Sequence, residues 1–215
     1  MTPNINNWKN IYGGGYGEGP SSYIKAKIIA RLLKKYAITN YADIGCGKGL
    51  LLLWVNGGQG YDIIPGKGIK ILDIEKGYDG RYQAVVANTL FDILKDDKVA
   101  GRNVSMMAKE YIFIITQWSG ARRSTFDSLY VHRKYDSADI SALFPDFNVV
   151  ESFIWGFPMY SLYYRLLELV SSGRSKIGKG GTLNFLNPFI CVFFMADGLF
   201  KTKGRLIVAV LKRKV

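Results

Sequence analysis

One short stretch of the chain combines an acid with three glycines at alternating positions. It runs Asp43-Ile44-Gly45-Cys46-Gly47-Lys48-Gly49 and follows a short run of apolar residues. Glycines at a turn let the backbone approach a ligand closely, and the free N–H groups at the start of a helix can bind an anion. The stretch therefore predicts a strand, a ligand-binding turn and the start of a helix, in that order.

Three classes of ligand are bound by turns of this kind. A phosphate-binding loop has Ser or Thr after Gly-Lys, whereas Gly49 follows Lys48 here. A dinucleotide-binding turn has the pattern G-x-G-x-x-G, whereas here the third glycine comes one residue early and Leu50 stands in its place. The remaining pattern, acid-x-G-x-G-x-G, resembles motif I of the class I S-adenosylmethionine-dependent methyltransferases.

The resemblance implies S-adenosylmethionine as the cofactor and assigns residues to it. In that family the glycine turn holds the methionine end of the cofactor, and the leading acid, here Asp43, binds near its amino group. Two further stretches, 8–20 and 84–94, are similar to the family's N-terminal segment, which folds over the cofactor, and to its fourth strand with the turn after it. The cofactor contacts that this resemblance implies are Tyr12, Gly17, Asp43, Gly45, Cys46, Gly47, Gly49 and Asn88.

Two more acids resemble the family's ribose-binding and adenine-binding residues. Asp62 lies 13 residues after Gly49, and ten residues separate Asp62 from Asp73. A parallel crossover through a helix needs about a dozen residues or more. Either the helix of this crossover is missing or reduced to a turn at 65–68, or Asp73 is itself the ribose acid. We favour Asp62 for the ribose and Asp73 for the adenine.

The elements that must position these residues alternate along the chain. Apolar residues recur at helical spacing from Ser21 or Ser22 to Tyr36, with lysines expected on the other face. Strands are predicted at 38–44, 59–64, 69–74, 82–87, 111–117, 148–155 and 206–211, and helices at 22–36, 50–55, 91–109, 137–144 and 160–170. This order predicts an α/β fold with a largely parallel sheet. The resemblance implies a Rossmann-like, doubly wound sheet whose last strand is antiparallel.

The length of 215 residues predicts one domain over 1–215, which the resemblance implies is a methyltransferase domain. Within it we expect a cofactor-covering segment and helix at 1–37, a cofactor-binding half at 38–120 and a substrate-side half at 121–215. The stretch around His132 and Tyr135 resembles the family's late substrate-side region. His132 is the one histidine of the chain and a candidate base for a hydroxyl acceptor, and Tyr135 is a second catalytic candidate. For His132, a loop residue that only caps or packs is the alternative.

Several functions are disfavoured by what the sequence lacks. Neither Cys46 nor Cys191 has the basic neighbourhood that a cytosine-C5 mechanism needs, and Asn88-Thr89-Leu90-Phe91 departs from the Asp/Asn-Pro-Pro-aromatic signature of base-amine methyltransferases. DNA is therefore a disfavoured substrate, and no ligand spacing indicates a metal. The net charge of +12 leaves RNA open as an acceptor. We expect a small molecule, a glycan or a lipid-linked intermediate, with a non-catalytic cofactor-binding protein as the alternative of another class.

The last quarter of the chain concentrates the charge. Residues 160–215 hold ten basic and two acidic residues, a net charge of +8. Within them 183–200 is strongly apolar, and basic residues flank it on both sides. An apolar centre with basic rims is typical of an element that lies on an anionic membrane, and a helix packed on the sheet or a homodimer contact is the alternative. With no leader pattern at the N-terminus, we expect a cytoplasmic protein, peripheral at the membrane.

Overall fold

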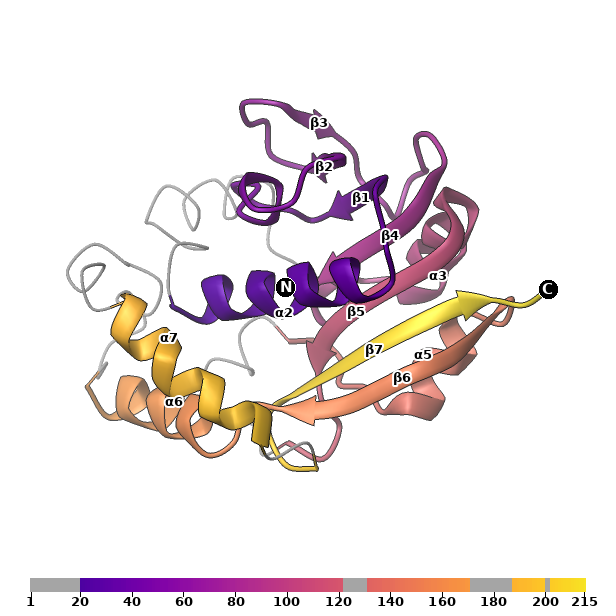
Figure 1. Cartoon of the computed structure of the whole chain (residues 1–215). Coiled ribbons are helices and arrows are strands. Elements are labelled where there is room, and N and C mark those ends of the chain that lie inside the picture. The colour runs from indigo at the N-terminus through magenta and orange to yellow at the C-terminus, as the bar shows by residue number, and fades with distance from the viewer. Residues whose placement is uncertain (1–19, 122–130, 171–186, 200–201) are drawn as a thin grey trace.

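A computed structural model describes residues 20–121, 131–170, 187–199 and 202–215 (Figure 1). The strands are β1 (Tyr41–Ile44), β2 (Gly58–Asp62), β3 (Ile69–Ile71), β4 (Tyr82–Asn88), β5 (Ala108–Gln117), β6 (Phe147–Trp155) and β7 (Leu206–Arg213). The helices are α2 (Pro20–Lys35), α3 (Asp97–Met107), α5 (Ser137–Leu143), α6 (Met159–Val170) and α7 (Asn187–Ala196). Three short 3₁₀ turns accompany them: η1 (Leu51–Leu53), η2 (Phe91–Ile93) and η4 (Asp197–Leu199).

The seven strands form one sheet in the order β3-β2-β1-β4-β5-β7-β6. β7 runs antiparallel to β5 and β6, and all other neighbours are parallel. The predicted α/β fold, mostly parallel with an antiparallel last strand, is confirmed.

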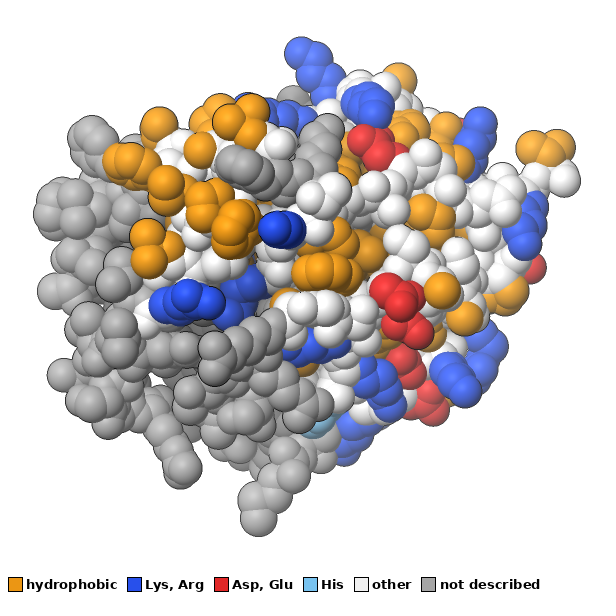
Figure 2. Space-filling view, turned by 90° about the horizontal axis from the view of Figure 1, so that it is seen from below, with side chains coloured by type: hydrophobic (Ala, Val, Ile, Leu, Met, Phe, Trp, Pro, Cys, Tyr) orange, Lys and Arg blue, Asp and Glu red, His pale blue; other side chains and the backbone are white. Residues whose placement is uncertain are grey.

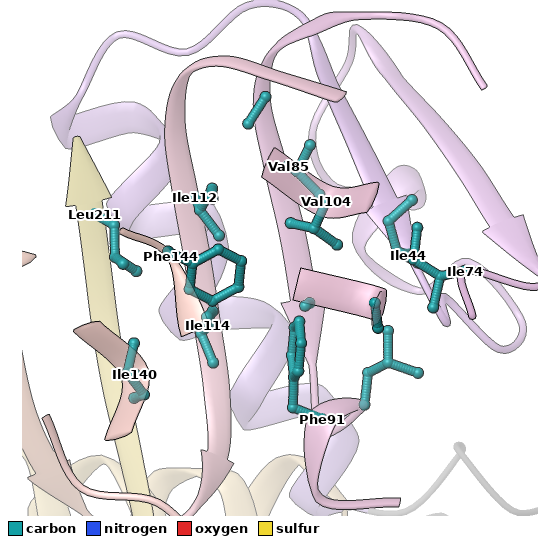
Figure 3. Close-up of a cluster of buried hydrophobic side chains, with 14 of the residues drawn as sticks. Ile44, Ile74, Val85, Phe91, Val104, Ile112, Ile114, Ile140, Phe144 and Leu211 are labelled. Atoms are coloured by element: carbon teal, nitrogen blue, oxygen red, sulfur yellow. The ribbon is translucent and has the colours of Figure 1, made fainter. Parts of the chain in front are cut away.

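Helices cover both faces of this sheet. On one face α3 and α5 pack against the central strands, and Figure 3 shows Val104 of α3 and Ile140 of α5 among the strand residues Ile112, Ile114 and Leu211. On the other face α2 packs through Ile29 and Leu33, and α6 and α7 add an aromatic cluster. The side chains that alternate along each strand therefore supply two separate cores.

Two predicted helices differ from the structure. The helix predicted at 50–55 is the single turn η1, because few residues lie between Gly49 and Gly57 and so short a helix closes too few hydrogen bonds to offset its nucleation. The helix predicted at 91–109 is divided into η2 and α3. Asp96 caps α3 by accepting a hydrogen bond from the backbone N–H of Val99, so the long helix begins at Asp97.

The connection from β2 to β3 contains no helix. The two strands pair in parallel, with Asp62 beside Ile71, and six residues join them. An isolated bridge between Gly66 and Ile69 closes the turn. The crossover helix is therefore reduced to a turn, as expected if Asp62 is the ribose acid, and Asp62 ends β2. Which of Asp62 and Asp73 binds the ribose stays a prediction.

The lysine-bearing face of α2 is not wholly on the surface. Lys34 and Lys35 are exposed, as expected, but Lys25 is buried. It lies four residues before Ile29 and seven before Leu32, on the apolar face of the helix. The expectation that the lysines of this helix lie on the face opposite its apolar residues is therefore wrong for Lys25.

Candidate functional site

The carboxyl ends of β1 and β4 lie side by side at the point where the strand order reverses. From β1 the chain proceeds to β2 and β3 on one side, and from β4 it proceeds to β5 on the other. Open α/β sheets bind ligands outside the carboxyl ends of the strands at such a switch point. The glycine turn follows β1 directly, and Asn88 ends β4. The structure thus brings together two stretches that the sequence separates by about forty residues.

The three glycines of the turn all have left-handed backbones. Their φ angles are +68° at Gly45, +57° at Gly47 and +72° at Gly49. A Cβ at Gly45 would also lie 2.9 Å from Cδ1 of Leu90, in the loop after β4. The turn therefore requires glycine both for its φ angles and for its closeness to the β4 loop.

Two buried acids lie beside this turn. Asp43 and Asp62 are each 4% exposed. Burial, reinforced by the negative charge of Asp62, raises the pKa of Asp43 to about 7. Burial also raises the pKa of Asp62, against hydrogen bonds from the backbone N–H groups of Gly47 and Ile64. A site with two desolvated carboxyl groups favours a positively charged ligand group, because a cation would restore their ionised form.

The Asp62 carboxylate holds the turn in place. Its Oδ2 accepts a hydrogen bond from the N–H of Gly47 over 2.8 Å, and its Oδ1 accepts one from the N–H of Ile64 over 3.0 Å. Each carboxylate oxygen has a second lone pair, so Asp62 can also accept from ligand hydroxyls. Asp73 follows β3 and is more exposed, where its Oδ2 pairs with Lys76 over 2.9 Å.

Asn88 and Gln117 present buried oxygens that have no hydrogen-bond partner among the described residues. These are Oδ1 of Asn88, at the end of β4, and Oε1 of Gln117, at the end of β5. Residues two apart on a strand share a face, so both side chains lie on the α2 side of the sheet, with Val86 and Ile115. Asp43 lies on this side too, two residues after Tyr41. Unpaired buried acceptors at the carboxyl ends of neighbouring strands indicate a ligand that supplies hydrogen-bond donors.

Lys25 is a site residue that the sequence analysis missed. Its Nζ donates a hydrogen bond to Oγ1 of Thr89, the residue after β4, over 3.2 Å. Burial lowers its pKa to about 8, opposed by the negative charge of Asp92. The signal was present in the sequence, because Lys25 lies at the i and i+4 spacing of the apolar residues of its helix.

The two catalytic candidates lie near this edge but differ in burial. His132 is exposed, and its backbone N–H donates to the carbonyl of Asp92 over 2.7 Å. The Tyr135 hydroxyl is buried and donates to Oδ2 of Asp97 over 2.8 Å, and the carbonyl oxygen of Phe91 lies 3.2 Å away as an alternative acceptor. These partners favour a structural role for Tyr135, and both catalytic assignments stay predictions.

Of the remaining predicted cofactor residues, the structure describes Cys46 but not Tyr12 or Gly17. The N–H of Cys46 donates to the carbonyl of Tyr61 over 3.1 Å, and burial raises the pKa of its thiol far above the ordinary range, so the group is no nucleophile. Tyr12 and Gly17 lie outside the described residues. Within the described ranges, no three metal-ligating side chains come together.

Comparison with known proteins gives the fold. No family model matches the chain, and no curated protein matches it in sequence. Solved structures of similar fold include the following three. A putative sarcosine dimethylglycine methyltransferase from Galdieria sulphuraria is 12% identical, with 89% of this chain and 86% of that chain covered and a TM-score of 0.57. The N-methyltransferase NodS from Bradyrhizobium japonicum, in complex with S-adenosyl-L-homocysteine, is 13% identical, with 92% and 89% covered and a TM-score of 0.57.

The third, the [4+2]-cyclase SpnF, is 12% identical, with 86% of this chain and 81% of that chain covered and a TM-score of 0.57. The chain therefore has the fold of the class I methyltransferases.

Proposed function

We propose that this chain is a methyltransferase that uses S-adenosylmethionine and acts on a small molecule, a glycan or a lipid-linked intermediate. The observation that carries the proposal is the glycine turn with its two buried acids at the switch point of a class I methyltransferase sheet. When bound, S-adenosylmethionine would supply an activated methyl group for in-line transfer to a nucleophile. The protein's part is to align that group with its acceptor, and such alignment can contribute several kcal/mol.

The residues present fit this cofactor. Asp43 would face its ammonium group, since a buried carboxyl whose pKa is raised to about 7 gains by pairing with a cation. The left-handed glycines leave the turn without side chains, so the methionine end can approach the backbone. Asp62 would take the ribose hydroxyls and Asp73 the adenine amine. The unpaired oxygen of Asn88 offers a further acceptor beside the turn.

Two other functions keep specific support. The charge of +12 favours RNA as an alternative acceptor. The likeness to the [4+2]-cyclase SpnF supports a role other than methyl transfer on the same fold. The test is transfer of labelled methyl from S-adenosylmethionine to RNA on one side and to a small-molecule and lipid extract on the other. We expect label in the extract, whereas binding of the cofactor without transfer to either would support a role other than methyl transfer.

We further propose that α7 rests on an anionic membrane, where a lipid-linked acceptor would be found. Phe194 faces the interior, whereas Val192, Phe193 and Met195 on α7 and Leu199 on η4 are exposed. Figure 2 shows hydrophobic side chains gathered on the left, the side where Figure 1 places α6 and α7, with lysine and arginine side chains beside them. No helix in the described ranges has the length and apolar character to cross a bilayer.

The charge near α7 supports a membrane rather than another apolar partner. α2 packs along α7, and Nζ of Lys27 lies 3.8 Å from Sδ of Met195. Arg31 and Lys34 on α2 and Lys203 after η4 are exposed. Each basic residue near an anionic surface adds about 1 kcal/mol of attraction, so an apolar face with this rim complements anionic lipid.

A further inference from the structure

Lys25 is held inside the protein at the end of the sheet where the proposed active site lies. Its side chain is 9% exposed, and its ammonium group donates to Oγ1 of Thr89. Lysine is rarely buried unless it is paired, and here the hydrogen-bond partner Thr89 is neutral, while the carboxylate of Asp92 acts on the lysine through its charge. An apolar residue at this position would pack α2 against the protein equally well, as Ile24 and Ile29 do on the same helix.

The partner of Lys25 has an unusual backbone. Thr89 has a φ of +51°, a left-handed conformation that β-branched residues rarely adopt. Its N–H donates to the carbonyl of Ile115 over 2.6 Å, which fixes the turn after β4 against β5. Strained residues of this kind gather at functional sites, where the strain sets the direction of a side chain. Here it directs Oγ1 to the lysine.

Unpaired acceptors lie on the same side of the sheet. Asn88 immediately precedes Thr89, and Gln117 ends the neighbouring strand β5. Their buried oxygens have no partner within the described residues, so this edge offers a ligand two acceptors and one amine. A ligand with a hydroxyl or ammonium group carries the donors that these oxygens lack.

We propose that Lys25 contacts the methyl acceptor and removes the proton of its hydroxyl or ammonium group. The proposal rests on the proposed methyltransferase function. The neutral amine forms a bond to the proton, and the lone pair left on the acceptor oxygen or nitrogen forms the bond to the methyl carbon. The bond between the methyl carbon and the sulfonium sulfur would break, and the sulfur would keep its electron pair. Lys25 would later release its proton to water.

The surroundings of Lys25 let it act as a base near neutral pH. Burial lowers its pKa to about 8, and the negative charge of Asp92, on η2, opposes that shift. In the described structure α2 also packs against α7, η1 and β4, whose described residues carry no charged side chain, and Glu151 of β6 pairs with Lys35, ten residues further along the helix. A base whose pKa lies near the working pH is effective in proton transfer.

The experiment compares Lys25→Met, Lys25→Arg and a control, Lys34→Met, in which an exposed lysine of the same helix is changed. One readout is the pH dependence with which trace acetic anhydride labels each lysine, followed by mass spectrometry of peptides. We expect a midpoint near pH 8 for Lys25, well below the ordinary lysine value. The second readout is the affinity of each variant for S-adenosyl-L-homocysteine. The third readout is the rate of labelled methyl transfer to the small-molecule and lipid extract as a function of pH.

We expect both Lys25 variants to bind S-adenosyl-L-homocysteine within about twofold of the unchanged chain and to lose about 100-fold or more in transfer rate. Arginine cannot act as a base, so it should not rescue the rate. Labelling of Lys25 with an ordinary lysine midpoint, or transfer by Lys25→Met at the unchanged rate, would overturn the proposal alone. Absence of S-adenosyl-L-homocysteine binding by the unchanged chain would overturn the methyltransferase function and this proposal together.

Discussion

Oδ2 of Asp62, at the end of β2, accepts a hydrogen bond from the backbone N–H of Gly47, in the middle of the glycine turn, over 2.8 Å. The residue that the family resemblance assigns to the ribose therefore also fixes the turn assigned to the methionine end. No crossover helix follows β2, so the strand and its acid turn directly into the short loop to β3. One carboxylate thus couples the two halves of the proposed cofactor site.

This coupling makes Asp62 the more sensitive of the two candidate acids. We expect Asp62→Ala to weaken S-adenosyl-L-homocysteine binding by at least tenfold, because hydrogen bonds to charged groups contribute roughly 1.5–3 kcal/mol each. Asp73→Ala should weaken binding less, since Asp73 pairs with Lys76 and does not touch the turn. Calorimetric titration of both variants checks the order, and a larger loss for Asp73→Ala would transfer the ribose role to Asp73.

The glycine turn can be tested with a matched pair of variants. Gly45 and Gly68 have similar φ angles, +68° and +73°, but a Cβ at Gly45 would meet Leu90 whereas a Cβ at Gly68 would meet nothing within 4 Å. Alanine at either position meets left-handed strain of roughly 1–2 kcal/mol. We expect both variants to lower the urea midpoint, but only Gly45→Ala to reduce ligand binding by tenfold or more. Equal binding by the two variants would show that the turn is not part of a cofactor site.

Burial of Asp43 should make the stability of the ligand-free protein depend on pH. The pKa of Asp43 is about 7 in the folded chain and 3.8 as the reference value. The protonated Asp43 carboxyl therefore makes its full contribution to the free energy of unfolding below about pH 4. This contribution is lost as the pH rises through about 7. We expect Asp43→Asn to be more stable than the unchanged chain at pH 8, by an amount on the order of 4 kcal/mol, and to lose this advantage at pH 4.

Urea unfolding of the two chains between pH 4 and pH 8 measures this difference. A constant difference across the range would mean that Asp43 titrates normally. The same variant should bind S-adenosyl-L-homocysteine weakly at every pH, because it cannot present a negative charge to the ammonium group of the ligand.

The sequence was sufficient for the sheet and the turn because both depend on local signals. The alternating glycines indicate a turn with left-handed backbone, and the short apolar runs indicate buried strands. The crossover from Asp62 could be bounded by counting residues, since a helix needs more chain than the ten residues available.

Other features depend on contacts that the local pattern does not contain. The break before α3 comes from Asp96 capping a new helix inside a continuous helical pattern. The burial of Tyr135 depends on Asp97, 38 residues away in sequence. The role of Lys25 depends on the packing of α2 against the end of β4, where Thr89 has a backbone that its residue type does not indicate.

The membrane proposal predicts a difference between two exposed apolar positions. Phe193 on α7 is 61% exposed and Val150 on the edge strand β6 is 48% exposed. We expect the unchanged chain and Val150→Glu to float with vesicles that contain phosphatidylserine, and Phe193→Glu to stay at the bottom. Vesicles of phosphatidylcholine alone should capture none of the three.

Circular dichroism and gel filtration of the same samples supply the control for folding. A chain that stays at the bottom with both kinds of vesicle, or a Phe193→Glu variant that is insoluble, would assign the exposed face of α7 to a protein contact instead of a membrane.

Calorimetric titration of the purified chain with S-adenosylmethionine, S-adenosyl-L-homocysteine, NAD and ATP tests the central claim most directly. The left-handed glycine turn and the buried Asp43 and Asp62 predict saturable one-to-one binding of the first two ligands. NAD and ATP should give no saturable signal, because the turn lacks the third glycine position of a dinucleotide site and the hydroxyl residue of a phosphate loop. Preferential binding of NAD or ATP, or no binding of S-adenosyl-L-homocysteine, would contradict the account.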